Sequence, residues 1–334
     1  MSPGESLERL RGQKVLVTGA AGFIGGQLCE RLARAEINVH AVSRSFSPGV
    51  HGSLKRERVD LSEPEATRRL LRRTQPDLVF HLAGFANGAR DPALIAPNLQ
   101  GNLLTTIHLL TAALECGAPL VVLPASLEEP DAADDAPSSP YAAAKWAASA
   151  YGRMFHQLYG LPVSIARIFI TYGPAGNNLH KLIPYSILSL LDGVAPRLSS
   201  GRRGVDWIHV DDVVDGLLAL AAARGAAGAT LDIGSGLLTS VRSVVERIAR
   251  LVDPARTLTP IFDAALDRPQ EQVRVASVRR TEELTGWKAR IPLDEGLART
   301  VEWYRRNRAS LRRCAPQPRS AVLPFVQLEH AGGH

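Results

Sequence analysis

The 334-residue chain has few cysteines, no Cys-x-x-Cys pair and no long apolar segment. Its three cysteines, Cys29, Cys116 and Cys314, lie far apart, so neither a zinc site nor a disulfide framework is indicated. No apolar run reaches the roughly 18 residues that a membrane span needs, and the opening "MSPGESLERLRGQK" lacks the apolar core of a signal peptide. We therefore expect a cytoplasmic protein with no metal site and no membrane partner.

Acidic residues are missing from the segment 305–319, which contains six arginines: Arg305, Arg306, Arg308, Arg312, Arg313 and Arg319. The formal net charge is +6, so this segment accounts for the whole excess. A near-neutral body argues against a nucleic-acid partner. A content of 45% hydrophobic and 22% charged residues is typical of a folded globular protein.

Short apolar runs alternate with segments of helical spacing in the first half of the chain. We expect strands at 15–18, 39–42, 57–61, 76–84, 119–126 and 161–169, and helices at 24–32, 63–75, 96–117 and 139–160. This alternation predicts an α/β fold, a Rossmann-like doubly wound parallel sheet with helices on both faces. From about Tyr172 the rhythm changes, which predicts a smaller, interwoven C-terminal substrate domain.

Gly19, Gly22 and Gly25 follow the first expected strand and open the first expected helix, with Phe23 and Ile24 between them. Glycines at this place permit a tight turn and a close approach of backbone to a pyrophosphate, and helix N-terminal amides favour negative charge. The spacing favours dinucleotide binding over a purely structural turn.

The end of the second strand bears on which dinucleotide binds. An acid there would bind a ribose 2'-hydroxyl, whereas an arginine suits a 2'-phosphate. This chain has Ser43 and Arg44, so we expect NADP(H), with NAD(H) as the alternative. Further cofactor contacts are expected where the third and fourth strands end, at Asp60, Leu61, Leu82, Ala83 and Gly84.

Several motifs together resemble the extended short-chain dehydrogenases, and within them the nucleotide-sugar epimerase, dehydratase and ketoreductase family. They are "TGAAGFIG", "DL", "HLAG", "PNLQGN", "YAAAK", "RIFITYGP", "DWIHVDDVVDG" and "GWKARIPLDEGLARTVEWY", and they cover roughly residues 13 to 305. The resemblance implies an NAD(P)-binding domain at 10–173 plus 206–235 and a nucleotide-sugar-binding domain at 174–205 plus 236–311. The remaining segment 312–334 is punctuated by proline and glycine, so we expect a flexible tail there. The resemblance also implies a homodimer, paired through the helices that begin near Asn98 and Tyr141, although the same apolar positions could face only the sheet.

The resemblance further implies a catalytic group made of Ser126, Tyr141 and Lys145. A free phenol has a pKa near 10, so a nearby ammonium is needed to stabilise the phenolate. Tyr141 could then exchange a proton with a sugar hydroxyl or ketone, while Ser126 hydrogen-bonds the same oxygen and Lys145 also holds the nicotinamide ribose. Without this context, a Tyr-x-x-x-Lys pair is usually an exposed surface feature.

Substrate contacts implied by the resemblance are Phe85, Asn87, Ser126, Tyr141, Asn178, Arg203 and Arg268. One departure affects this set, because Ile170 stands where the family usually has an asparagine that contacts the diphosphate. The two arginines could instead be solvated surface residues.

Glu128 separates the possible reactions. In the family's 4,6-dehydratases a glutamate at this spacing helps to remove the C5 proton, but Leu127 replaces the acid that precedes it in one dehydratase class. The run "SLEE" resembles several 4-ketoreductases better. We therefore favour NADPH-dependent reduction of a 4-keto nucleotide sugar. The alternatives are a 4-epimerase or 4,6-dehydratase that recycles its cofactor, with Glu128 as base, and a non-catalytic NADP-binding sensor.

Overall fold

The protein is described by a computed structural model over residues 2–46, 48–131, 135–176, 178–255, 257–267 and 273–314. The chain divides into two compact units, unit 1 (Met1–Phe169, Asp211–Ser235, Ala276–Ala289) and unit 2 (Ile170–Val210, Gly236–Val275, Arg290–His334). The expected substrate arginine Arg268 and the expected tail beyond residue 314 lie outside the described residues. The assignment of cofactor and nucleotide sugar to separate domains stays a prediction.

Unit 1 is built on an eight-stranded sheet in the order β11-β7-β6-β5-β1-β2-β4-β3. Its strands are β1 (Val15–Thr18), β2 (Val39–Ser43), β3 (Gly49–His51), β4 (Leu54–Arg58), β5 (Leu78–His81), β6 (Leu120–Ser126), β7 (Val163–Ile168) and β11 (Thr230–Ile233). All neighbouring pairs are parallel except β3 and β4. This confirms the predicted Rossmann-like α/β fold.

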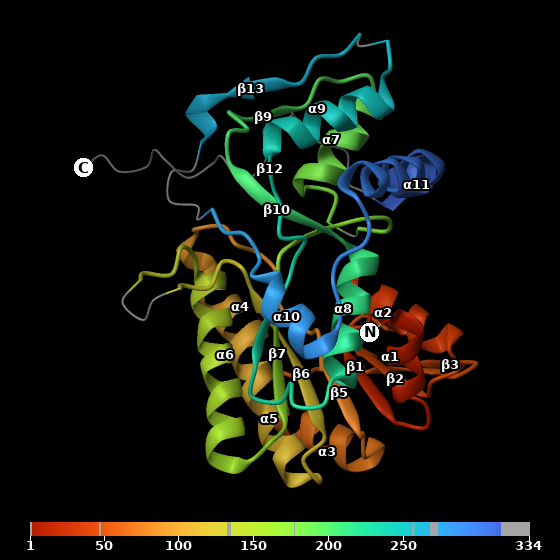
Figure 1. The fold of residues 1–334 in the computed structure, drawn as a ribbon, viewed down its shortest axis with the longest axis vertical. Coiled ribbons are helices and arrows are strands. Elements are labelled where there is room, and N and C mark those ends of the chain that lie inside the picture. The colour runs from red at the N-terminus through yellow and green to blue at the C-terminus, as the bar shows by residue number, and fades with distance from the viewer. Residues whose placement is uncertain are drawn as a thin grey trace. The chain divides into compact units, whose positions relative to one another are not determined.

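Helices cover both faces of this sheet (Figure 1). They are α1 (Pro3–Arg9), α2 (Phe23–Arg34), α3 (Pro64–Thr74), α4 (Ile95–Asn98), α5 (Thr105–Glu115), α6 (Pro140–Tyr159), α8 (Val210–Ala222) and α10 (Val278–Thr285). Short 3-10 and π-helical segments, η1 (Pro92–Leu94) and η2 (Leu99–Leu104), join β5 to this helical layer. Between the sheet and α3, α5 and α6 lies a core of fully buried side chains that includes Leu71, Val79, Leu109, Val121 and Ile165.

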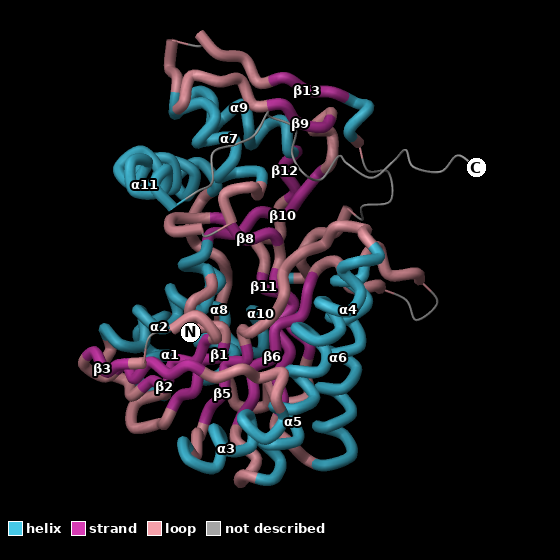
Figure 2. The backbone as a smooth tube through the Cα atoms, turned by 180° about the vertical axis from the view of Figure 1, so that it is seen from behind, coloured by secondary structure: helices cyan, strands magenta, loops and turns pink. Residues whose placement is uncertain are grey.

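The chain connects the middle strands so that β1 lies between β2 and β5 (Figure 2). The connection after β1 leads to β2 on one side, whereas the later strands β5, β6 and β7 extend the sheet on the other. In open α/β sheets, ligands bind at the carboxyl ends of the strands where the strand order reverses in this way. The ends of β1, β2, β5 and β6 therefore define the edge at which to look for a site.

Two expected elements differ from the structure. The strand expected at 57–61 corresponds to β4, which spans Leu54–Arg58 and so begins earlier than expected. Its sequence LKRER exposes charged side chains beside the terminal strand β3, so no apolar run marks it. The expected helix 96–117 is interrupted by π-helical η2, because a hydrophobic period does not reveal a change in hydrogen-bond register.

Unit 2 has two small sheets, one in the order β12-β10-β8 and one that pairs β13 with β9. Its elements are β8 (Ile170–Tyr172), β9 (Arg197–Ser199), β10 (Gly204–His209), β12 (Leu238–Ser240), β13 (Ile261–Asp263), α7 (Leu182–Leu191), α9 (Val241–Val252), η3 (Ala264–Leu266) and α11 (Leu293–Cys314). Its core includes Ile187, Val244, Ile248, Leu297 and Tyr304. Among the described residues, no helix is long and apolar enough to cross a membrane.

Candidate active site

The glycine turn after β1 is shaped by close backbone contacts. Gly19 has a φ of +65°, and a Cβ placed on it would lie 2.3 Å from the carbonyl oxygen of Leu82. A Cβ on Gly25 would lie 2.3 Å from the carbonyl oxygen of Gly19, so the turn and the start of α2 tolerate only glycine. Gly22 is the N-cap of α2 and supplies no side chain to satisfy the first helical amides. This cradle fits the pyrophosphate of a dinucleotide.

The residues expected to select the cofactor lie at the ends of β2 and β4. The Ser43 hydroxyl accepts a hydrogen bond of 3.3 Å from the Ser45 amide, and Arg44 is exposed. Asp60 accepts a hydrogen bond of 3.0 Å from the Ser62 amide, which lowers the carboxyl pKa, and the Arg44 guanidinium lowers it further. Arg44 is therefore within electrostatic reach of Asp60.

The segment after β5 is held by Asn102, a residue that the sequence motif contained but to which no role was assigned. The Asn102 Oδ1 accepts from the Phe85 amide, and its Nδ2 donates to the Phe85 carbonyl, each at 3.0 Å. A Cβ on Gly84 would lie 2.8 Å from Asn102 Oδ1. The carbonyl of Asn87 accepts a 3.3 Å hydrogen bond from Asn98. The expected contacts Leu82, Ala83, Gly84, Phe85 and Asn87 thus lie on a loop fixed by two asparagines.

Ser126, Glu128 and Tyr141 come together where β6 ends and α6 begins. Ser126 is buried and is hydrogen-bonded to the Tyr141 phenol, while its Oγ also accepts a 3.2 Å hydrogen bond from the Glu128 amide. Tyr141 lies in the first turn of α6, whose N-cap Ser139 accepts from the Ala142 amide at 3.1 Å. The Glu128 carboxylate is half-buried and faces Gly88, where an added Cβ would lie 3.1 Å from its Oε2.

Lys145 follows Tyr141 by one turn of α6 and is buried. Its ammonium donates to the carbonyl of Pro124. Burial lowers the pKa of Lys145 to about 8, with the Glu129 carboxylate acting in the opposite direction. Burial raises the pKa of Tyr141, and so does the negative charge of Glu128, whereas the hydrogen bond with Ser126 lowers it. The phenol of Tyr141 therefore stays protonated near neutral pH unless a further interaction stabilises its phenolate.

Residues expected to bind substrate in unit 2 are placed as follows. The Asn178 side chain accepts a 3.1 Å hydrogen bond from the His180 amide. Arg203 is half-buried, and its carbonyl accepts a 3.0 Å hydrogen bond from the Val241 amide at the start of α9. Ile170, at the position of the family's asparagine, opens β8.

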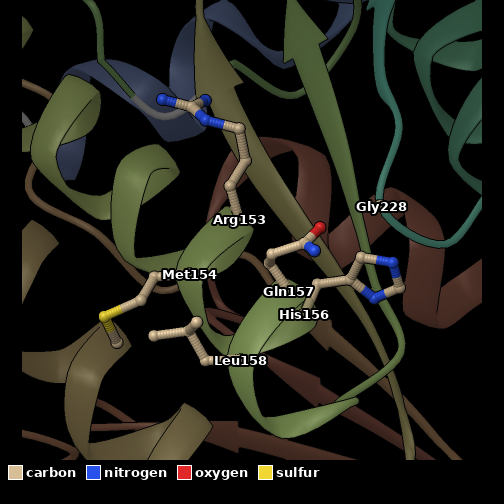
Figure 3. Close-up of a pocket in the computed structure, with 6 residues that line it drawn as sticks. All are labelled: Arg153, Met154, His156, Gln157, Leu158 and Gly228. Carbon is tan, nitrogen blue, oxygen red and sulfur yellow. The ribbon is translucent and has the colours of Figure 1, made fainter.

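A surface hollow of about 440 Å³ lies at the other end of α6 (Figure 3). It is lined by Arg153, Met154, His156, Gln157, Leu158 and Gly228. Tyr141 and Lys145 belong to the first two turns of α6, whereas all of the lining residues except Gly228 belong to its last turns. The hollow therefore contains none of the residues that sequence or geometry brings to the active site. Among the described residues, no cluster of histidine, cysteine and acidic side chains could hold a metal ion.

Comparison with known proteins decides the family. Residues 15–234 match the model of the NAD dependent epimerase/dehydratase family. The chain belongs to this family. The matched range contains the glycine turn, Ser126, Tyr141 and Lys145, so the resemblance predicted from the motifs is confirmed.

Proteins similar to this chain include enzymes named for, or solved with, nucleotides and nucleotide sugars. A dTDP-glucose 4,6-dehydratase of an Actinoplanes species is 31% identical, over 89% of this chain and 99% of the relative. The Bordetella bronchiseptica enzyme WbmF, solved with NAD+ and UDP, is 28% identical with a TM-score of 0.78, covering 91% of this chain and 96% of its own. MoeE5, solved with UDP-glucuronic acid and NAD, is 32% identical with a TM-score of 0.75, covering 88% of this chain and 99% of its own.

Proposed function

We propose that this protein oxidises the C4 hydroxyl of a pyrimidine-nucleotide hexose and returns the hydride to the same sugar, giving the C4 epimer. The hydrogen-bonded pair of Ser126 and Tyr141, with the buried Lys145 one helical turn further on, is the observation that carries this proposal. Its support from relatives is that MoeE5 is solved with UDP-glucuronic acid, WbmF is solved with UDP, and the Actinoplanes relative is named for dTDP-glucose.

The residues of this chain would perform the proton chemistry. The Tyr141 phenolate accepts the proton of the C4 hydroxyl, and Ser126 donates a hydrogen bond to the same oxygen. Lys145 stabilises the phenolate by its positive charge. Gly19, Gly22, Gly25 and the adjoining strand ends would hold NAD(P)+, which would accept the hydride from C4 and, once reduced, return it to the same carbon. Because the cofactor would end each cycle oxidised, turnover needs no second redox substrate.

The second candidate is 4,6-dehydration, in which C4 is oxidised and water is eliminated from C5 and C6. The position of Glu128 favours this reaction. Its half-buried carboxylate lies close enough to Tyr141 to raise the phenol pKa, so it could remove the C5 proton of a sugar bound there. Against it, Leu127 is buried and apolar, so that neighbour of Ser126 cannot protonate a departing C6 hydroxyl. The name of the Actinoplanes relative favours dehydration. The family description names both epimerases and dehydratases, and the Actinoplanes relative is named a dehydratase. Both findings support these two candidates better than reduction of a 4-keto sugar by external NADPH, which the sequence favoured.

Product analysis separates these reactions. The purified protein would be incubated in D₂O with UDP-glucose, UDP-glucuronic acid and dTDP-glucose, and separately with a 4-keto-6-deoxy dTDP-sugar and NADPH. We expect the C4 epimer of a UDP-sugar by proton NMR, with no deuterium at C5 and no net change in cofactor absorbance. A 4-keto-6-deoxy product with deuterium at C5 would show elimination instead. NADPH consumed in proportion to the keto sugar would show the ketoreductase.

The preferred cofactor is proposed to be NADP(H), since Ser43 and Arg44 stand where an acid would bind a 2'-hydroxyl. The solved relatives WbmF and MoeE5 contain NAD, so the preference needs a direct test. Calorimetric titration should show NADP+ binding about tenfold more tightly than NAD+, a difference of about 1.4 kcal/mol. Arg44→Ala should remove that difference while leaving NAD+ affinity unchanged. Equal affinities in the unmodified protein would contradict the proposal.

We further propose that the enzyme works in the cytoplasm. A separate proposal is that two chains pair through α5 and α6. Apolar side chains on these helices are exposed in the single chain, among them Leu114, Tyr151, Leu158 and Tyr159. Burial of such a surface in a symmetric dimer would remove it from water.

A further inference from the structure

Glu129 is a buried residue three positions after Ser126, and neither the sequence nor the family comparison assigned it a role. Glu129 as a whole is only 2% exposed. Its Oε1 accepts a 2.8 Å hydrogen bond from the Ser126 amide and a 3.1 Å hydrogen bond from the Ser149 hydroxyl. Its own amide donates to the Ser126 carbonyl at 3.1 Å. Glu129 thus ties the end of β6 to α6, the helix that carries Tyr141 and Lys145.

The charge of Glu129 acts on the same groups. Burial raises its pKa, while the hydrogen bonds from Ser126 and Ser149 and the charges of Lys145 and Arg167 lower it. In return, Glu129 opposes the effect of burial on Lys145, and it adds to the rise in the pKa of Tyr141. The groups that face it therefore come from β6, α6 and β7, and they include two cations.

We propose that Glu129 is a positioning residue that keeps the Lys145 ammonium charged inside the site and fixes the backbone of Ser126. The pKa of Lys145 is already lowered to about 8, so the loss of its counter-charge would lower that pKa further and leave more of the side chain neutral near pH 7. A neutral Lys145 could not stabilise the Tyr141 phenolate. This inference rests on the proposed function, because Lys145 matters only if Tyr141 exchanges protons.

A titration of Lys145 tests the inference without substrate or turnover. The chain has five lysines, so protein labelled with ¹³C at the lysine ε position should give few signals, and Lys145→Arg assigns the relevant one. We expect the Lys145 signal to titrate near pH 8 in the unmodified protein and at a lower pH in Glu129→Gln, which keeps an acceptor oxygen and removes the charge. An unchanged Lys145 titration in a folded Glu129→Gln protein would overturn the inference.

Two further variants separate charge from structure. Ser149→Ala removes a hydrogen bond to Glu129 but retains the carboxylate, so the Lys145 titration should remain near that of the unmodified protein. Glu129→Asp retains the charge at a shorter reach and supplies a second measurement if Glu129→Gln does not fold. If Ser149→Ala moves the Lys145 titration as far as Glu129→Gln does, the effect is structural and the proposed role is wrong.

The pH profile of turnover connects the titration to catalysis. In Glu129→Gln the fall of kcat at alkaline pH should begin at a lower pH than in the unmodified enzyme, with KM for the nucleotide sugar little changed. A lower kcat at every pH with no displacement of the profile would contradict the inference. Absence of turnover in the unmodified protein would instead contradict the proposed function, and the lysine titration would still decide the role of Glu129.

Discussion

At the scale of single residues, the catalytic proposal depends on one hydroxyl. Tyr141→Phe keeps the aromatic ring in its place but removes the group that is hydrogen-bonded to Ser126. We expect kcat to fall by about 10³, within the range that a positioned acid or base contributes, because the phenol is the group proposed to accept the C4 proton. Cofactor affinity, measured by calorimetric titration, should stay within about twofold of the unmodified value.

The matched control is Tyr159→Phe, at the opposite end of the same helix and 53% exposed. It removes the same atom without touching Ser126, so kcat should not change. Residual activity in Tyr141→Phe comparable with that of the control would show that the proton relay is assigned to the wrong residue.

At the scale of elements, a buried histidine joins the strands and the helix beside the site. His81 ends β5, its Nδ1 lies 2.9 Å from the Thr18 hydroxyl on β1, and its Nε2 lies 3.2 Å from the Thr106 hydroxyl on α5. Thr18 also accepts from the Ala83 amide at 3.1 Å, so the chain of hydrogen bonds extends into the expected cofactor loop. The neutral imidazole is therefore part of the frame that holds the ends of β1 and β5 together.

Because His81 is buried and neutral, the free energy of unfolding should depend on pH in the acidic range. Burial, together with the smaller effect of the Lys145 charge, lowers the pKa of His81 to about 3, whereas an unfolded histidine titrates near 6.5. Below pH 6.5 the unfolded chain takes up a proton that the folded protein does not, so the free energy of unfolding falls with falling pH, by up to about 1.4 kcal/mol per pH unit for this one group. The contribution is complete above pH 6.5 and is lost progressively toward pH 3.

Urea unfolding between pH 7 and pH 5, followed by circular dichroism, measures the effect. His81→Gln should be less stable than the unmodified protein at pH 7, because two threonine hydroxyls lose a fitted partner, yet its stability should fall less steeply with acid. His180→Gln, at an exposed position of unit 2, is the control and should keep the slope of the unmodified protein. Parallel slopes for all three proteins would contradict a neutral buried His81.

At the scale of the whole molecule, local sequence signals predicted the alternating strands and helices and the place of the glycine turn. They succeed there because apolar periodicity and glycine requirements are local properties. No role was predicted for Glu129, because the local sequence does not show that its carboxylate is buried beside β6 and α6. The bounds of β4 and the π-helical η2 were not predicted for a similar reason, because strand pairing and hydrogen-bond register depend on more than the apolar pattern of the segment itself.

Exposed apolar side chains on α6 bear on the proposed pairing of two chains. Tyr151 and Leu158 are seven residues apart on α6, hence on the same side of the helix, and are 38% and 66% exposed. If this side pairs with a second copy, sedimentation equilibrium should give twice the chain mass at micromolar concentration, and the double substitution Tyr151→Arg with Leu158→Arg should give the monomer. Val50→Arg changes an equally exposed apolar residue on β3, away from these helices, and should leave the mass doubled. A dimer that survives the double substitution would mean that α6 faces solvent in the assembly, and a monomer in the unmodified protein would remove the proposed interface altogether.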